Sequence, residues 1–137
     1  MSRHYLVTGG AGFIGSNYVH RLIQRGEKVT IFDNLSRAGA PRNVAWLEET
    51  FGKNAFRLVV GDVRSADLLA ESAKDADVIV HLAGQVAVTT SVTNPRDDFE
   101  ANALGTFNAL EAARLSQRDP IFIYASTNKV YGGMEDV

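Results

Sequence analysis

Three spaced glycines near the amino terminus have the spacing of a phosphate cradle. The stretch GGAGFIG (9–15) reads as GxGxxG on Gly10, Gly12 and Gly15, or as GxxGxxG when Gly9 replaces Gly10. One glycine permits a tight turn, a second lets backbone approach a pyrophosphate, and the third lets a helix pack on a strand. A helix amino terminus at this place would offer free N–H groups and a favourable dipole to anionic oxygens. The stretch therefore predicts a site for the pyrophosphate of a dinucleotide.

A carboxylate lies where the ribose of such a ligand would need one. Asp33 follows Gly15 by eighteen residues, close to the spacing of about 20 for an acid that accepts from the adenosine ribose hydroxyls. Its charge would repel a 2′-phosphate, which favours NAD over NADP, although Arg37 could partly offset that repulsion. The alternative is a glycine-rich turn in a nucleotide-free sheet, with Asp33 capping a loop. Asp62 could accept from the adenine amine, or could equally be a turn or cap aspartate.

The end of the chain holds tyrosine and lysine, a pair that is one way to build a proton-transfer site, but not at the spacing that places both on one helical face. A lysine four residues after a tyrosine shares its helical face and lowers the pKa of the phenol, which can then take a proton. The tyrosines are Tyr5, Tyr18, Tyr124 and Tyr131, and none has a lysine four residues later. We therefore expect no such couple within these 137 residues.

Alternating strands and helices must position these groups. Apolar, β-branched runs and helical spacing predict strands at 3–8, 28–33, 55–60, 77–82 and 120–125, and helices at 12–25, 43–51, 65–73 and 95–116, with a loop at 34–41. The strands are continuous apolar runs, which is typical of a parallel sheet buried on both faces. Right-handed crossovers then predict an α/β fold, a Rossmann-type doubly wound sheet of order 3-2-1-4-5 that is truncated after its fifth strand.

Composition narrows the class of protein. A chain of 137 residues favours one domain, and its net charge of -2 without any block of like charge argues against nucleic acid or an anionic membrane as partner. No uncharged stretch is compatible with lipid. The absence of cysteine excludes disulfides and thiolate metal sites and suits a cytoplasmic protein, and the three scattered histidines predict no metal site.

With these motifs together, the chain resembles the extended short-chain dehydrogenase/reductase superfamily of NAD-dependent epimerases and dehydratases. The motifs are TGGAGFIGS (8–16), FDNLSR (32–37), GDVR (61–64), HLAGQVA (81–87) and ASTNKVYGG (125–133). HLAGQVAVTTSVTNPRDDFEANALGT (81–106), NLSRAGAPRN and STNKVYG are similar to the CDP-tyvelose 2-epimerase (CDP-paratose 2-epimerase) branch. Members of that family are more than twice as long. The resemblance therefore implies that residues 1–137 are an amino-terminal NAD-binding domain, without the sixth strand, the Tyr–Lys couple or the substrate-binding lobe.

The resemblance also implies roles for individual residues. Those expected to line the cofactor are Gly9, Gly12, Phe13, Ile14 and Gly15 at the pyrophosphate, Asp33 and Asn34 at the ribose, Asp62 and Val63 at adenine, and Leu82, Ala83 and Gln85 after the fourth strand. Thr127 falls on the catalytic Ser/Thr position, where its hydroxyl would bond the sugar oxygen being oxidised. Those expected to line the sugar pocket are Thr89, Thr90 and Ser91.

Several of these assignments have structural alternatives. Gln85 and the Thr-Thr-Ser run could equally form a polar loop with caps. Asn102 would brace the polar interior near the site, or only cap backbone carbonyls. His81, inside an apolar strand, is expected to be a core histidine with satisfied nitrogens.

The implied activity of the full-length enzyme is epimerisation of a nucleotide-linked sugar, with a CDP-sugar favoured. Bound NAD would take hydride from a sugar carbon, C2 in this branch, and return it to the other face. The alternatives are a non-catalytic dinucleotide-binding or sensor module, and a 4,6-dehydratase or C4-epimerase on the same scaffold. The family implies a homodimer or higher oligomer at full length, and these residues alone are expected to be inactive.

Overall fold

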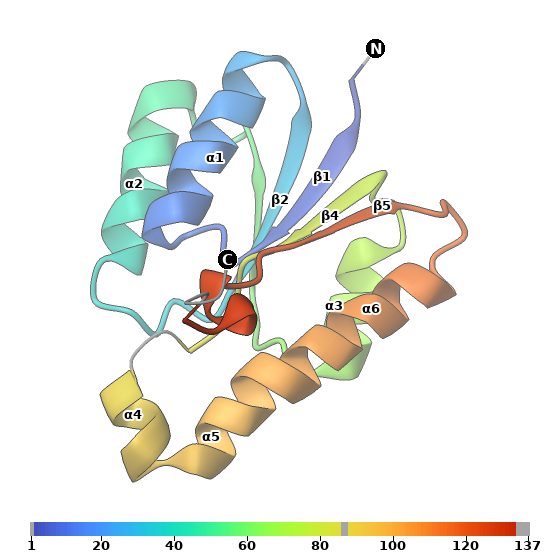
Figure 1. Cartoon of the computed structure of the whole chain (residues 1–137). Coiled ribbons are helices and arrows are strands. Elements are labelled where there is room, and N and C mark those ends of the chain that lie inside the picture. The colour runs from blue at the N-terminus through green and yellow to red at the C-terminus, as the bar shows by residue number, and fades with distance from the viewer. Residues whose placement is uncertain (1, 86–87, 134–137) are drawn as a thin grey trace.

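One parallel sheet organises the chain (Figure 1). The computed structural model describes residues 2–85 and 88–133. The strands are β1 (His4–Thr8), β2 (Lys28–Asp33), β3 (Arg57–Val60), β4 (Val78–His81) and β5 (Ile121–Tyr124). They pair in the order β3-β2-β1-β4-β5, and every pair is parallel. The predicted fold class and strand order are confirmed.

Helices cover the two faces of the sheet (Figure 1). Helices α1 (Phe13–Gln24) and α2 (Ala40–Phe51) pack on one face, and α3 (Ala66–Ala73) and α6 (Gly105–Leu115) on the other. Alternate residues of one strand enter different cores because strand side chains point to opposite faces in turn. Val7 of β1 packs with α1 and α2, whereas its neighbour Leu6 packs with α3 and α6.

Burial on both faces holds only in the middle of the sheet. All residues of β4 are buried, as are most of β1 and β2. The outer strands β3 and β5 are largely exposed or half-buried. The continuous apolar runs at these two positions therefore overstate burial, because an outer strand has a neighbour on one side only.

The predicted helix over 95–116 is interrupted. It consists of α5 (Pro95–Phe99), a π-helical turn η1 (Glu100–Leu104) and α6. Helical spacing predicts an apolar stripe that includes Phe107 and Leu110. On α6 this stripe faces outward, since Phe107 is 59% exposed and Leu110 is exposed as well. The small residues Gly105 and Ala109 face the core instead. They permit close packing, because a Cβ on Gly105 would lie 2.6 Å from Cγ2 of Val63.

Three further differences concern loops and helix ends. Helix α2 begins at Ala40, three residues before the predicted start, with Pro41 in its first turn. A short helix, α4 (Val88–Thr93), covers residues for which a polar loop was an alternative. Helical spacing predicts Phe13 and Ile14 on the apolar stripe of α1, but both are exposed at its amino end. Among the described residues, no helix has the length and apolar character needed to cross a membrane.

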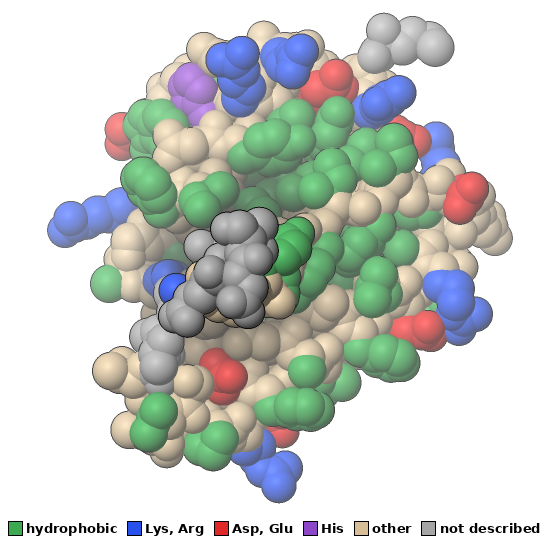
Figure 2. All heavy atoms as spheres, viewed as in Figure 1, with side chains coloured by type: hydrophobic (Ala, Val, Ile, Leu, Met, Phe, Trp, Pro, Cys, Tyr) green, Lys and Arg blue, Asp and Glu red, His purple; other side chains and the backbone are tan. Residues whose placement is uncertain are grey.

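Strand β5 presents an open apolar face. Ile121 and Ile123 are in register with Val78 and Val80, which pack under α1 and α2, yet they are 53% and 46% exposed. Figure 2 shows hydrophobic side chains gathered over β5 and along the outer side of α6. β5 is also the last strand of the sheet, and an apolar outer strand is a template for pairing with another chain.

We expect the 137-residue chain to self-associate through β5, and Ile123→Lys to reduce that association, because a lysine on an outer strand opposes pairing. Sedimentation velocity over a range of concentrations measures the effect. Val92→Lys on α4 is a matched control, since Val92 is also exposed but lies away from β5. Monomeric behaviour of the unsubstituted chain at high concentration would contradict this prediction.

Candidate dinucleotide-binding site

The glycine loop joins β1 to α1 at the carboxyl edge of the sheet, and its glycines lie close to other backbone atoms. Gly9 has φ +68°, and a Cβ there would lie 2.8 Å from the amide nitrogen of Ala83. A Cβ on Gly15 would lie 2.2 Å from the carbonyl oxygen of Gly9, and one on Gly12 would lie 3.2 Å from the same oxygen. Gly9, Gly12 and Gly15 therefore bring loop, strand and helix into direct backbone contact.

The amino end of α1 remains open toward an anion. Its cap residue, Gly12, is extended, and no described side chain caps the helix or places an acid in its first turn. The N–H groups and the dipole of a twelve-residue helix therefore point to the carboxyl edge of the sheet without a competing carboxylate. This geometry fits a pyrophosphate, whose oxygens would accept from the free N–H groups at this helix end.

Asp33, at the end of β2, orders the loops on both sides of it. Its Oδ2 accepts a hydrogen bond from the amide of Ala11 at 3.0 Å, and its Oδ1 accepts from the amide of Leu35 at 2.8 Å. Asp33 therefore does cap the adjoining loops, as the alternative interpretation of this residue predicted. This capping does not exclude the ribose role, because each carboxylate oxygen has two acceptor positions and one remains on each. Asn34 uses its Oδ1 to accept from the amide of Ser36 at 3.1 Å.

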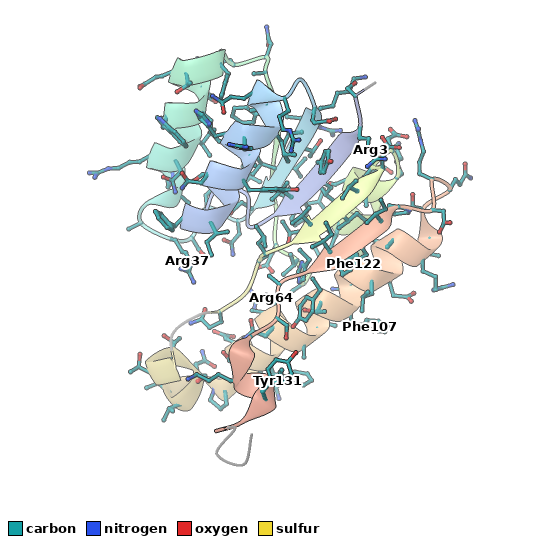
Figure 3. All side chains as sticks on the ribbon, turned by 45° about the horizontal axis from the view of Figure 1, so that its top comes forward. Arg3, Arg37, Arg64, Phe107, Phe122 and Tyr131 are labelled. Atoms are coloured by element: carbon teal, nitrogen blue, oxygen red, sulfur yellow. The ribbon has the colours of Figure 1, made fainter. Side chains whose placement is uncertain are left out.

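Asp62, which follows β3, forms hydrogen bonds and an ion pair with Arg64, a residue for which the sequence predicted no role. Arg64 donates to Asp62 from its backbone amide at 2.9 Å and from Nε at 3.1 Å, and an ion pair of 2.9 Å joins the two side chains. These hydrogen bonds hold the pKa of Asp62 below its ordinary value. Arg64 also reaches Glu100 at 3.3 Å and so connects the end of β3 to η1 (Figure 3). The turn interpretation of Asp62 thus has direct support.

Val63, the other expected adenine neighbour, turns its side chain away from the edge. It is buried beneath Gly105, and its carbonyl oxygen accepts from Nδ2 of Asn108 at 2.9 Å. Only its backbone remains for a ligand at the end of β3.

Residues after β4 lie beside the glycine loop, as their predicted role requires. The amides of Leu82 and Ala83 both donate to Oγ1 of Thr8, and the amide of Gln85 donates to Oδ1 of Asn102 at 2.7 Å. Asn102 therefore braces the loop after β4. His81 is a core histidine with satisfied nitrogens, as expected; it is 1% exposed, and burial lowers its pKa to about 4.

The expected catalytic and sugar-pocket residues follow β5 and β4 at the same edge (Figure 1). Thr127 is the cap of the short 3-10 turn η2 (Asn128–Tyr131), and its exposed hydroxyl accepts from the amide of Lys129 at 3.2 Å. Thr89, Thr90 and Ser91 lie in α4 rather than in a loop. The parallel sheet thus brings the glycine loop, Asp33, the segment after β4 and Thr127 to one edge, where ligands of open α/β sheets bind.

Two residues for which the sequence predicted no role, Thr8 and Asn43, form hydrogen bonds at this edge. Thr8 accepts the two amides after β4, and Asn43 donates from Nδ2 to the carbonyl oxygen of Ala11 at 2.7 Å. Thr8 directly precedes the glycines and Asn43 lies within NLSRAGAPRN, so both were inside quoted motifs. Neither residue type alone indicated a partner so far along the chain.

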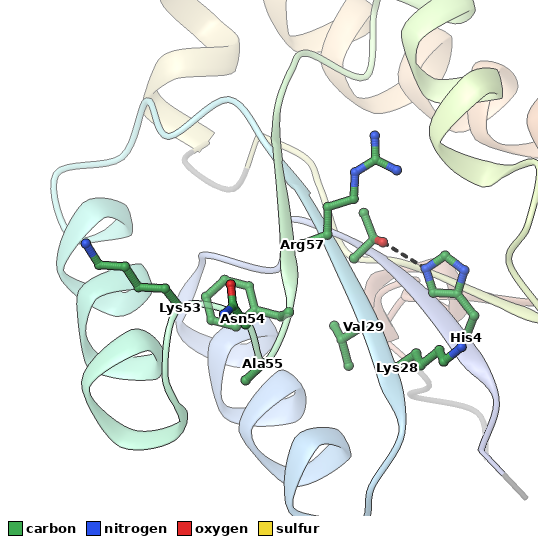
Figure 4. A pocket seen from close by; sticks show the side chains of 9 residues that line it. His4, Lys28, Val29, Lys53, Asn54, Ala55 and Arg57 are labelled. Carbon is green, nitrogen blue, oxygen red and sulfur yellow. Dashed lines mark hydrogen bonds between the residues drawn. The ribbon is translucent and has the colours of Figure 1, made fainter.

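A groove at the opposite, amino edge of the sheet is separate from this site (Figure 4). His4, Lys28, Lys53 and Arg57 contribute to its lining, and Nε2 of His4 lies 2.8 Å from Oγ1 of Thr30. His4, Lys28 and Arg57 begin β1, β2 and β3, and Lys53 lies between α2 and β3, whereas the glycine loop follows the end of β1.

Comparison with known proteins agrees with the geometry. Residues 6–137 match the family model of GDP-mannose 4,6 dehydratase. The chain is 46% identical over 134 residues to CDP-paratose 2-epimerase from Salmonella typhi, covering 95% of this chain and 38% of the relative. It is 38% identical over 132 residues to dTDP-glucose 4,6-dehydratase from Mycobacterium tuberculosis, with the same coverages of 95% and 38%.

One similar protein has been solved with NAD bound. The UDP-glucose 4-epimerase of Thermus thermophilus, in complex with NAD, superimposes with a TM-score of 0.69 at 37% identity, covering 81% of this chain and 33% of that one. The present chain spans 38% of the length of the curated relatives named above. The resemblance to extended epimerases and dehydratases, predicted from the motifs, is confirmed. The chain belongs to the GDP-mannose 4,6 dehydratase family.

Proposed function

We propose that residues 1–137 form the NAD-binding domain of a nucleotide-sugar epimerase of the CDP-tyvelose 2-epimerase type. The observation that carries the proposal is the cradle in which a Cβ on Gly15 would lie 2.2 Å from the Gly9 carbonyl oxygen, beside the open amino end of α1. A pyrophosphate fits there because it needs N–H donors and close approach of backbone.

The remaining residues define how NAD would lie. Asp33, with Asn34 beside it, would take the adenosine ribose at the end of β2, and the backbone at Asp62 and Val63 would border adenine. Phe13 and Ile14, exposed in the first turn of α1, would flank the pyrophosphate. Leu82, Ala83 and Gln85 would line the path toward Thr127.

When bound, NAD supplies a reversible two-electron acceptor for a sugar carbon. The hydroxyl of Thr127 would hydrogen-bond the sugar oxygen at that carbon and orient it, and Thr89, Thr90 and Ser91 would border the sugar. The Tyr–Lys couple that the family resemblance implies as the base lies outside these residues, because no tyrosine here has a lysine four residues later. The 137-residue chain should therefore bind NAD without turning over a sugar nucleotide.

Calorimetric titration with NAD, paired with an activity assay on the same chain, tests this domain assignment. Binding without turnover agrees with it. No binding up to millimolar NAD would sink the proposal. NAD binding by a full-length protein that turns over no sugar nucleotide would favour the alternative of a non-catalytic dinucleotide-binding module.

The preference for a CDP-sugar rests on the likeness to CDP-paratose 2-epimerase at 46% identity, against 38% for the dehydratase. The dehydratase and the C4-epimerase therefore stay as alternative activities. Incubating a full-length enzyme with CDP-, UDP- and dTDP-sugars and following the products by NMR separates them. Turnover of only UDP- or dTDP-sugars would contradict our choice. We further propose that the full-length protein is a homodimer or higher oligomer, which sedimentation measures.

We expect Asp33→Asn to weaken NAD binding by roughly 10- to 100-fold, the cost of one or two charge-assisted hydrogen bonds. In Asp33 one carboxylate oxygen accepts from the amide of Ala11 and the other from the amide of Leu35. An asparagine side chain can accept through its oxygen only, because its nitrogen is a donor, so one of these two bonds is lost. Discrimination against NADP should fall in parallel, since the repelling charge is gone. Calorimetric titration with NAD and with NADP measures both effects.

Asp119→Asn is the matched control for this substitution. Asp119 is exposed in the turn before β5, with φ +50°, a conformation that asparagine tolerates well. It should leave both affinities unchanged. Equal NAD affinity in the two variants would remove Asp33 from the proposed ribose site.

A further inference from the structure

Residues 82–85 form one wall of the glycine loop. A Cβ on Gly9 would lie 2.8 Å from the amide nitrogen of Ala83 and 3.0 Å from the carbonyl carbon of Leu82. The two backbones therefore touch, and a shift of this segment must move or open the cradle. The contacts that hold residues 82–85 in place therefore affect the shape of the glycine loop to which a dinucleotide would bind.

The beginning of the segment is held by a buried hydroxyl and by one main-chain hydrogen bond, from the amide of Leu82 to the carbonyl oxygen of Thr8 at 3.1 Å. Oγ1 of Thr8 accepts hydrogen bonds from the amides of Leu82 at 3.1 Å and Ala83 at 3.2 Å. The same oxygen lies 2.7 Å from Nδ1 of His81. Because it already accepts two N–H groups, its own hydrogen points to that nitrogen, and His81 Nδ1 is an acceptor.

The direction of the other bonds follows from this. With Nδ1 accepting, the neutral imidazole carries its hydrogen on Nε2, which lies 3.2 Å from Oγ1 of Thr106. Thr106 in turn donates to the carbonyl oxygen of Asn102 at 2.6 Å. Thr8, His81, Thr106 and Asn102 thus form one chain of bonds, the His81 relay. It links the end of β1 to η1 through the interior.

The far end of the relay holds the other end of the segment. The side chain of Asn102 accepts from the amide of Gln85 at 2.7 Å and donates to Asp98 at 3.1 Å. Gly84 makes this approach possible, since a Cβ there would lie 2.8 Å from Oδ1 of Asn102. Residues 82–85 are therefore anchored at one end by Thr8, which contacts His81, and at the other by Asn102, which is linked to His81 through Thr106.

We propose that His81 is a positioning residue for the dinucleotide: through Thr8 and Asn102 it fixes the backbone of residues 82–85 against the glycine loop. This inference rests on the proposed function. His81 is buried and reaches no ligand itself, so it acts only through the amides that its partners hold. The shape of the cradle then depends on a side chain behind the sheet edge.

The test compares His81→Phe with the unsubstituted chain. Phenylalanine keeps a ring in the core but bonds neither Thr8 nor Thr106. The amides of Ala83 and Gln85 should exchange hydrogen roughly tenfold faster. The amide of Leu82, which also donates to the carbonyl oxygen of Thr8, and the amides of the central strands should keep their protection. NAD should bind roughly tenfold more weakly, whereas AMP, which needs mainly the Asp33 side of the site, should keep its affinity within about twofold.

His4→Phe is the matched control. His4 also makes two hydrogen bonds through its ring, to Thr30 and to the carbonyl oxygen of Asp75, but at the amino edge of the sheet (Figure 4). It should leave exchange at residues 82–85 and NAD affinity as they are. If His81→Phe does not fold, Thr8→Val keeps the side-chain shape, removes the hydroxyl and should give the same two results.

Each outcome bears on a different claim. Unchanged exchange at 82–85, or equally faster exchange throughout the sheet, overturns the positioning role. Unchanged NAD affinity in a variant with faster local exchange overturns it as well. Failure of the unsubstituted chain to bind NAD overturns the proposed function, while the exchange of free protein still shows whether His81 holds the segment.

Discussion

Gly15→Ala should lower the free energy of unfolding by about 3 kcal/mol, the upper part of the range for an atom forced into a packed site. The added Cβ would lie 2.2 Å from the carbonyl oxygen of Gly9 and 2.8 Å from Cα of Gly10. Both neighbours are backbone atoms, so no side chain can rotate away. Either α1 or the loop must shift.

The same substitution should weaken NAD binding on the order of 100-fold, because a shifted loop misplaces several N–H donors at once. Urea unfolding and calorimetric titration measure the two effects separately. The affinity should fall even at temperatures where the variant remains fully folded.

Gly39→Ala is the matched control for Gly15→Ala. Gly39 precedes α2 with φ -84°, and a Cβ there would meet no atom within 4 Å. The free energy of unfolding of Gly39→Ala should differ from that of the unsubstituted chain by less than about 1 kcal/mol, since alanine tolerates this conformation and loses less entropy on folding. If the two variants had the same stability and NAD affinity, the close approach at Gly15 would not matter.

Acid should destabilise the fold through His81. Burial lowers the pKa of His81 from an ordinary 6.5 to about 4 in the folded chain. Between these values the unfolded state binds more protons than the folded state, so the free energy of unfolding falls as pH is lowered. The contribution is fully present above pH 6.5 and is lost by about pH 4. Its size is on the order of 3 kcal/mol, since one pKa unit corresponds to 1.4 kcal/mol.

Urea unfolding of the unsubstituted chain and of His81→Gln across this pH range isolates the effect. The variant should lose much less stability on acidification, because glutamine does not titrate. His20→Gln is the control: His20 lies half-buried between Trp46 and Phe51 on the outer side of α1 and α2, so this variant should retain the steep dependence.

Asp62 does not confuse this comparison. Its pKa is lowered from an ordinary 3.8 by the hydrogen bond from Arg64, so any stability it contributes is lost only at lower pH. Equal pH dependence in the unsubstituted chain and in His81→Gln would show that the burial of His81 has no such consequence.

The sequence by itself determined the order of the sheet and the edge at which we propose the site. Apolar runs such as KVTIFD, separated by helical patterns, predict parallel strands because both signals are local. The glycine spacing and Asp33 predict the cradle for the same reason, since a turn, a close approach and a strand end depend on neighbouring residues. The strand order and the close approach at the glycines agree with the observed fold. The dinucleotide site at that edge, with Asp33 at the ribose, stays a prediction.

The tertiary structure alone decided which face of each helix is buried and which polar groups are paired. Small side chains face the core on α6 because close packing on α3 and β4 favours them, so the larger Phe107 and Leu110 point outward. The side chain of Arg64 donates to the carboxylate of Asp62. The hydroxyl oxygen of Thr8 accepts from the amides of Leu82 and Ala83, which follow it by more than 70 positions. Such partners are distant in sequence and meet only when the strands pair. For this reason residue types and spacing predicted the edge where a dinucleotide would bind, while the hydrogen bonds that shape that edge depend on the assembled fold.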